Sequence, residues 1–81
     1  MYTKTQFGLE LKKRVQNKQD TFKIGEWAHT MYLEHIEDID LEFRDILLTL
    51  NTMELGEEFA YSYKELVKIA EDLIKGKNPT L

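Results

Sequence analysis

Hydrophobic residues recur at helical spacing in four segments of the chain. In the first segment Phe7, Leu11 and Val15 follow one another at intervals of four, which places them on one face of a helix. The spacing predicts four amphipathic helices, over approximately residues 4–18, 23–36, 41–55 and 63–75. The apolar positions of the other three stripes are Ile24, Trp27, Ala28, Met31, Tyr32 and Ile36; Phe43, Ile46, Leu47, Leu50 and Met53; and Leu66, Val67, Ala70, Leu73 and Ile74.

Residues that start and stop helices support these boundaries. Ser62 and Glu65 form the sequence signature of a capping box, in which each side chain accepts a hydrogen bond from the other residue's backbone N–H. Asp40 precedes the third helix and can cap it, while Gly56 stands where a left-handed residue would end it. These local signals predict the start of the fourth helix at residue 63.

The four apolar faces can be buried only against one another, which predicts an all-α fold, a compact helical bundle formed by residues 1–81 as a single small domain. Trp27 is expected to anchor its core. Residues 57–61 alternate polar and aromatic side chains, so we predict an extended connector there, with a short edge strand as the alternative and Phe59 as a candidate core residue. Because so small a domain has a small core, a homodimer that shares apolar faces is an alternative to a monomer.

Composition excludes several classes of function. The chain has no cysteine, which rules out disulfides, thiolate zinc sites and a cysteine nucleophile and favours a cytoplasmic location. The first residues lack the apolar stretch of an export signal, and the longest apolar run, residues 46–48, is far too short to cross a membrane. Ser62 is the one serine and is assigned to a helix cap, and the four glycines stand apart. We therefore expect a protein that is not an enzyme and that carries no cofactor.

One pair of residues has the spacing of a metal motif. Glu26 and His29 form a Glu-x-x-His pair, which di-iron helical bundles use to place two ligands on one face. Such sites need the motif twice, together with two further glutamates. His35 lies six residues after His29 and therefore on another face of the helix. We predict that the chain has no metal site.

Charge is distributed unevenly along the sequence. Residues 1–23 carry six basic and two acidic side chains, a net charge of +4, whereas residues 24–81 carry five basic and 13 acidic side chains, a net charge of −8. The simplest expectation is that the first helix packs across the acidic remainder, so that the charges offset each other. The total net charge of the protein is −4.

The acidic residues form two clusters, one before and within the third helix and one after it. Acids at such positions cap helices and keep a surface soluble, but they also attract basic partners. We predict a non-enzymatic interaction or regulatory module, of the inhibitor, immunity or adaptor type, that binds a basic protein surface. The candidate partner-binding residues are Glu34, Glu37, Asp38, Asp40, Glu42, Asp45, Glu54, Glu57, Glu58 and Tyr61.

A nucleic-acid-binding regulator is the alternative function. Residues 24–36 and 41–55 could form a helix-turn-helix pair, but Glu42, Asp45 and Glu54 on the would-be recognition helix would repel phosphate. We therefore do not expect nucleic acid to be the partner. If nucleic acid binds, the basic surface of the first helix is expected to hold it, through Lys12, Lys13, Arg14 and Lys18. A structural homodimer without any catalytic role is the remaining alternative.

Overall fold

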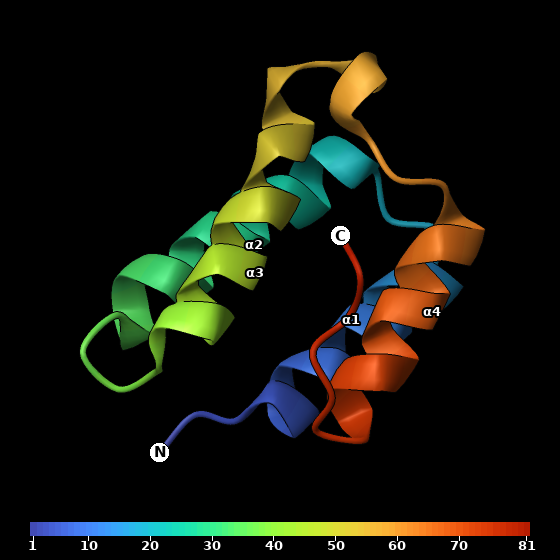
Figure 1. Cartoon of the computed structure of the whole chain (residues 1–81). Helices are drawn as coiled ribbons and strands as arrows, with labels where there is room; N and C mark the ends of the chain where they lie inside the picture. The colour runs from blue at the N-terminus through green and yellow to red at the C-terminus, as the bar shows by residue number, and fades with distance from the viewer.

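The chain folds into four α-helices that pack as two pairs. The computed structural model describes the whole chain, residues 1–81, with helices at Lys4–Gln16 (α1), Thr21–His35 (α2), Leu41–Asn51 (α3) and Tyr63–Ile74 (α4). α1 lies against α4 and α2 lies against α3, and the two helices of each pair run in opposite directions (Figure 1). No strand is present, so the predicted all-helical bundle is confirmed.

The predicted capping residues are in place. The Ser62 Oγ accepts a hydrogen bond from the Glu65 N–H at 3.1 Å, and the Glu65 side chain accepts one from the Ser62 N–H at 2.9 Å. An Asp40 carboxylate oxygen accepts from the Phe43 N–H at 2.8 Å and so caps α3. Each cap satisfies a backbone donor that the first turn of a helix leaves without a partner. This is why these short sequence signals locate the helix starts correctly.

The segment after α3 differs from the prediction. The α-helix ends at Asn51, and the chain continues as two 3-10 helices, Thr52–Leu55 (η1) and Glu57–Phe59 (η2). The prediction of extended backbone over 57–61 is wrong for 57–59, because the Phe59 and Ala60 N–H groups donate to the carbonyls of Gly56 and Glu57 and close a helical turn. Extended backbone begins at Ala60. Phe59 does not fill the core, since 47% of its surface is exposed.

One hydrophobic cluster joins the two helix pairs. The Phe7 ring of α1 stacks on the Trp27 ring of α2 with centroids 4.5 Å apart and meets Phe43 of α3 edge-on at 5.9 Å. The predicted role of Trp27 as a core anchor is therefore confirmed. Two residues outside the predicted stripes, Ile39 and Ile69, are also buried. The cluster consists of Phe7, Leu11, Val15, Ile24, Trp27, Ala28, Ile39, Phe43, Ile46, Leu47, Leu50, Met53, Leu66, Ile69, Ala70 and Leu73.

The N-terminal segment crosses the end of the α2–α3 pair. The Tyr2 ring stacks on His35 at 4.1 Å and on Phe43 at 5.8 Å between ring centroids. Burial raises the pKa of Tyr2 to about 12, because it disfavours a negative phenolate. The carboxylates of Glu10 and Glu34 also raise this pKa, and the Arg14 guanidinium lowers it.

This pKa predicts a loss of stability in alkali. Between pH 10 and about 12 the folded protein keeps the Tyr2 proton that the unfolded chain releases, so the free energy of unfolding should fall as the pH rises through this interval. Replacing Tyr2 with phenylalanine removes the titrating group and keeps the ring. Urea unfolding of both proteins at several alkaline pH values should show a steeper decline for the wild type. Parallel declines would contradict the prediction.

Candidate functional site

The fold separates charge into two halves of the molecule. The α2–α3 pair with η1 and η2, residues 20–59, carries 11 acidic and two basic side chains, a net charge of −9. We call it the acidic half. The α1–α4 pair with the chain ends, residues 1–19 and 60–81, carries nine basic and four acidic side chains, a net charge of +5. We call it the basic half.

Packing does not offset these charges. α1 lies mainly against α4 and not across the acidic helices, contrary to the simplest expectation from the sequence. The three ion pairs of the protein, Lys12–Glu71, Arg14–Glu10 and Lys68–Asp72, all lie within the basic half. No ion pair involves a residue of the acidic half, so its carboxylates keep their negative potential.

The first predicted acidic cluster surrounds the connection between α2 and α3. We call this cluster the acidic turn. The buried side chain of Ile39 anchors the connection to the core. The sequence did not predict this role, because Ile39 stands alone between acidic residues. All six carboxylates of the cluster belong to residues exposed to solvent. Its members are Glu34, Glu37, Asp38, Asp40, Glu42 and Asp45.

Half of these carboxylates also hold the fold together. Asp40 caps α3, and an Asp38 oxygen accepts a hydrogen bond from the Tyr2 N–H at 3.3 Å. A Glu42 oxygen accepts one from the Asn78 side-chain amide. Glu34, Glu37 and Asp45 make no side-chain hydrogen bond or ion pair within the chain, so these three are free to meet a partner.

Apolar surface accompanies the free carboxylates. The end of α2 has a shallow pocket of about 420 Å³, lined by Leu33, Glu34, Ile36, Glu37 and Asp38. Leu33 is largely exposed there. An apolar side chain bordered by carboxylates suits a partner surface that combines aliphatic and cationic groups.

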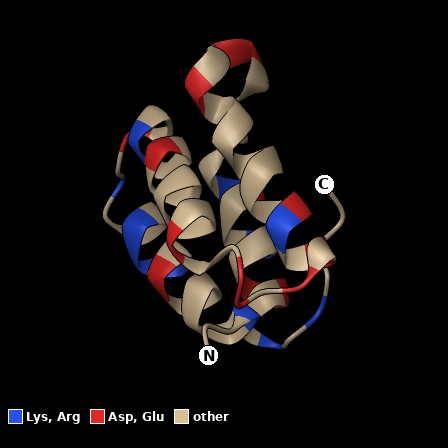
Figure 2. Cartoon of the chain, turned by 90° about the vertical axis from the view of Figure 1, so that its left-hand side faces the viewer, with Lys and Arg blue, Asp and Glu red and all other residues tan.

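The second acidic cluster lies at the other end of α3. Glu54 belongs to η1, and Glu57 and Glu58 belong to η2. Figure 2 shows the acidic residues of η2 at the end of the molecule, with no lysine or arginine beside them. The structure thus places the two predicted clusters apart, at opposite ends of α3.

Tyr61 lies with α4 and not with either acidic cluster. It lines a groove of about 400 Å³ together with Lys64, Glu65, Lys68 and other residues of the basic half. Burial raises the pKa of Tyr61, and the Glu65 carboxylate raises it further. The sequence placed Tyr61 near the acids because it follows Glu57 and Glu58 closely along the chain.

Several cations proposed for nucleic-acid binding already have partners. Lys12 pairs with Glu71 at 3.7 Å, and the Lys18 ammonium lies 5.1 Å from the centre of the Tyr63 ring. The Arg14 guanidinium lies over Trp27, 4.4 Å from the ring centre. Lys13 is the one member of the proposed set without such a contact, which weakens the basic surface of α1 as a phosphate site.

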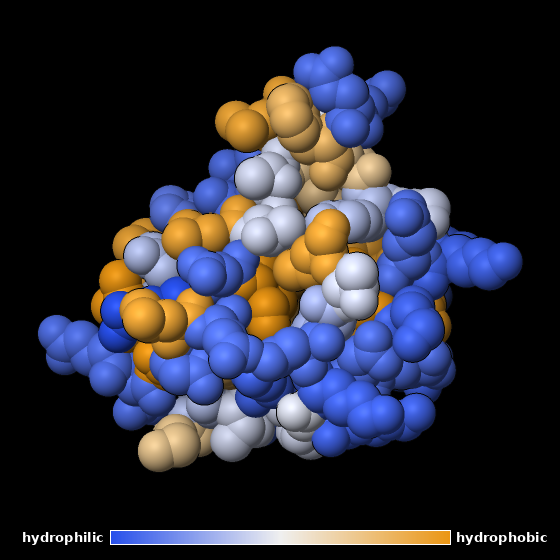
Figure 3. Space-filling view, in the orientation of Figure 1, coloured by the Kyte–Doolittle hydropathy of each residue, from blue (hydrophilic) through white to orange (hydrophobic).

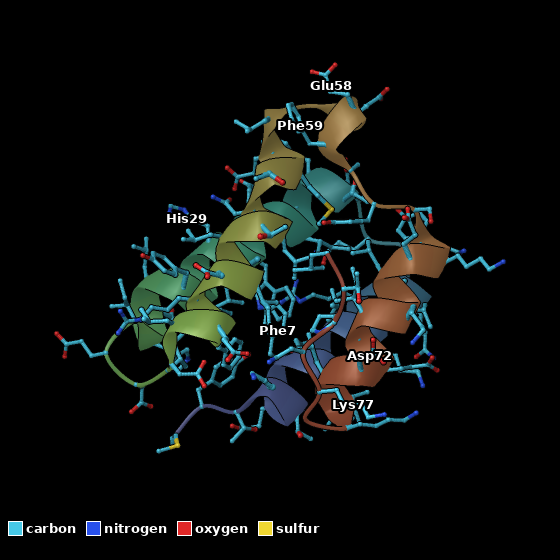
Figure 4. The ribbon with its side chains drawn as sticks, viewed as in Figure 1. Phe7, His29, Glu58, Phe59, Asp72 and Lys77 are labelled. Atoms are coloured by element: carbon cyan, nitrogen blue, oxygen red, sulfur yellow. The ribbon has the colours of Figure 1, made fainter.

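Glu26 and His29 lie one turn apart on α2, where Figure 4 shows His29 on the outer side of the helix. His29 is half-buried and its ring lies 6.4 Å from that of Tyr32. No group of three or more His, Asp or Glu side chains in the chain is arranged to hold a metal ion.

Comparison with protein-family models, with curated proteins and with solved structures found no match to this chain. None of its helices combines the length and the apolar character that crossing a bilayer requires. Evidence of function therefore comes from the surface of the chain itself.

Proposed function

We propose that this protein is a non-catalytic interaction module whose acidic half binds a basic surface of another protein. The observation that carries the proposal is the net charge of −9 on residues 20–59, which no ion pair relieves. Concentrating like charges on one half of a small domain lowers its stability through self-repulsion. A cationic partner would neutralise these charges and so relieve the repulsion. The negative potential of the acidic half would also steer such a partner to this surface.

The first contact residues that we assign are the three free carboxylates of the acidic turn and the exposed Leu33, which lines a pocket with Glu34 and Glu37. An inhibitor, immunity protein or adaptor that covers a basic functional surface would have these features. Asp40 is engaged as the cap of α3, whereas Glu34, Glu37 and Asp45 have no structural role within the chain and can pair with cations of a partner.

Affinity capture with the intact protein tests this function. We expect a protein with a basic surface to be retained at low salt and released at high salt, because the range of the attraction falls from about 30 Å at 0.01 M to about 3 Å at 1 M. A variant with Glu34, Glu37 and Asp45 changed to their amides should lose this protein. The matched control changes Glu65 and Glu71 of α4 to glutamine and should retain it. If the captured protein is retained equally at low and high salt and by the wild type and the variant, the proposal is refuted.

Self-association is a separate outcome, because the basic half of one molecule complements the acidic half of another. Light scattering at low salt distinguishes it. A doubled mass that reverts in high salt would show that the acidic half binds a second copy of this chain and would replace the proposed hetero-partner.

A further inference from the structure

The end of the molecule formed by η1, Gly56 and η2 exposes apolar side chains that the fold does not use. We call residues 52–59 the projecting end (Figure 1). η2 has no buried residue, and Met53 is the single buried side chain of η1. Leu55 is 70% exposed and Phe59 is 47% exposed. Neither side chain belongs to the core cluster, so both are available to contact a partner.

Figure 3 shows this end as a protrusion on which apolar surface adjoins strongly hydrophilic atoms. Figure 4 places Phe59 and Glu58 together at its tip. Apolar anchors surrounded by polar groups are typical of the centre of a protein interface.

A recess lies where the projecting end meets the start of α2. It has a volume of about 270 Å³ and is lined by Asp20, Thr21, Phe22, Met53, Gly56 and Glu57. Its apolar part comes from Phe22 and Met53, and its carboxylates come from Asp20 and Glu57. One Asp20 oxygen accepts a hydrogen bond from the Phe22 N–H at 3.0 Å, which leaves the other oxygen free.

Gly56 contributes backbone to the wall of this recess. Its φ of +151° and ψ of 167° belong to a backbone region that residues with a side chain rarely adopt. A glycine here lets the chain turn between η1 and η2 in a conformation that would strain a residue with a side chain.

The lining selects the chemistry of the occupant. The recess is smaller than the roughly 300–1,000 Å³ of most small-molecule sites and suits a single long side chain. An aliphatic stem can pack on Met53 while a planar cation stacks on the Phe22 ring and meets two carboxylates. Arginine combines these properties, whereas the compact ammonium of lysine neither stacks as a plane nor bonds two carboxylates with a fixed fork.

We propose that the recess receives an arginine side chain of a partner protein, while Leu55 and Phe59 are covered by apolar side chains of the same partner segment. The inference deepens the proposed function, on which it rests, by naming the partner's chemistry. A second copy of this chain is a poor occupant. In a symmetric contact Glu57 and Glu58 would face their own counterparts, and in a head-to-tail contact the second copy would have to supply an arginine. The chain's two arginines are also engaged or partly covered: Arg14 lies against Trp27, and Arg44 is half-buried.

Titration of the isotope-labelled protein with a synthetic peptide tests the inference. The probe is an amphipathic helix of leucine and arginine of about 18 residues. Its three controls replace arginine with citrulline, with lysine or with glutamate. With the arginine peptide we expect amide shifts in the NMR spectrum at Phe22, Gly56, Glu57 and Phe59. The citrulline peptide should bind at least ~10-fold more weakly, because it keeps the shape and removes the charge.

Variants of the protein provide the second arm. Phe59→Ser and Leu55→Ser should each lower the affinity for the arginine peptide about 10-fold, because each removes an interface anchor. Glu57→Gln should lower this affinity several-fold. Leu9→Ser is the matched control, because Leu9 is 56% exposed but belongs to α1, and it should leave the affinity unchanged. All four side chains are exposed, so the variants should remain folded, which the dispersion of the spectrum checks.

Three results would overturn the inference. Shifts confined to residues 34–45 would move the contact to the acidic turn and leave the proposed function standing. Equal binding of the arginine and citrulline peptides, or of the arginine and lysine peptides, would remove the arginine assignment. Absence of any shift would remove the recess as a docking site, while salt-sensitive capture of a basic protein tests the proposed function independently.

Discussion

Replacing Phe7 with alanine is expected to lower the free energy of unfolding by about 3 to 5 kcal/mol, because it deletes a fully buried aromatic ring and leaves a cavity. The position of the ring makes the loss large. Phe7 stacks on Trp27 and meets Phe43, so it connects α1 of one helix pair with both helices of the other (Figure 4). A domain of this size is stabilised by only about 0.05 to 0.15 kcal/mol per residue, so the variant should be close to unfolding.

Urea unfolding followed by the fluorescence of Trp27, the single tryptophan, measures this effect. Leu9→Ala is the control, since Leu9 lies two residues away on the same helix but faces solvent, and its substitution should change stability by less than about 0.5 kcal/mol. A Phe7→Ala loss similar to that of the control would mean that the two helix pairs do not meet at this ring.

Replacing Gly8 with alanine is expected to destabilise the protein by about 1 to 3 kcal/mol, the usual range for overpacking. Helix propensity alone predicts the opposite sign, a gain of about 1 kcal/mol. The difference arises from α4: a Cβ atom on Gly8 would lie 2.8 Å from the Ala70 carbonyl oxygen and 2.9 Å from the Ile74 nitrogen. Both are backbone atoms, so the two helices would have to move apart.

Thermal and urea unfolding of Gly8→Ala show directly whether the substitution lowers or raises the free energy of unfolding. Gly25→Ala is the matched comparison, because Gly25 is also a buried helical glycine, and its added Cβ would meet Glu54 and Leu50 at 3.2 to 3.3 Å. These contacts are less severe, so Gly25→Ala should be destabilising by less than Gly8→Ala. A stabilised Gly8→Ala protein would show that α1 and α4 are not packed this closely.

The arrangement of the helices also bears on the proposed partner. Because α1 and α4 hold the basic residues together, the protein presents one strongly negative and one positive half, and a basic partner has a single half to approach. The acidic turn and the projecting end lie at opposite ends of α3, so one partner that engages both would have to extend along that helix.

Local signals predicted most of the secondary structure. Periodicity of apolar residues depends on neighbours within two turns, and the caps at Asp40 and Ser62 involve residues three apart, so both can be identified along the sequence. The prediction was wrong between residues 57 and 59, where an alternating pattern suggested extended backbone. There the hydrogen bonds to Gly56 and Glu57 close a turn that no apolar periodicity marks.

Patterns along the chain were enough to predict a helical bundle, most of its buried helix positions and two clusters of acids. The pairing of α4 with α1, which separates the charges in space, became visible only in the folded molecule. Tertiary structure also decided that Gly8 is required by a close helix contact, that Asp38 and Glu42 bond distant residues, and that Phe22 and Glu57 line one recess. The reason is physical: these features depend on contacts between residues far apart in the chain, whereas helical periodicity and capping are set by neighbours.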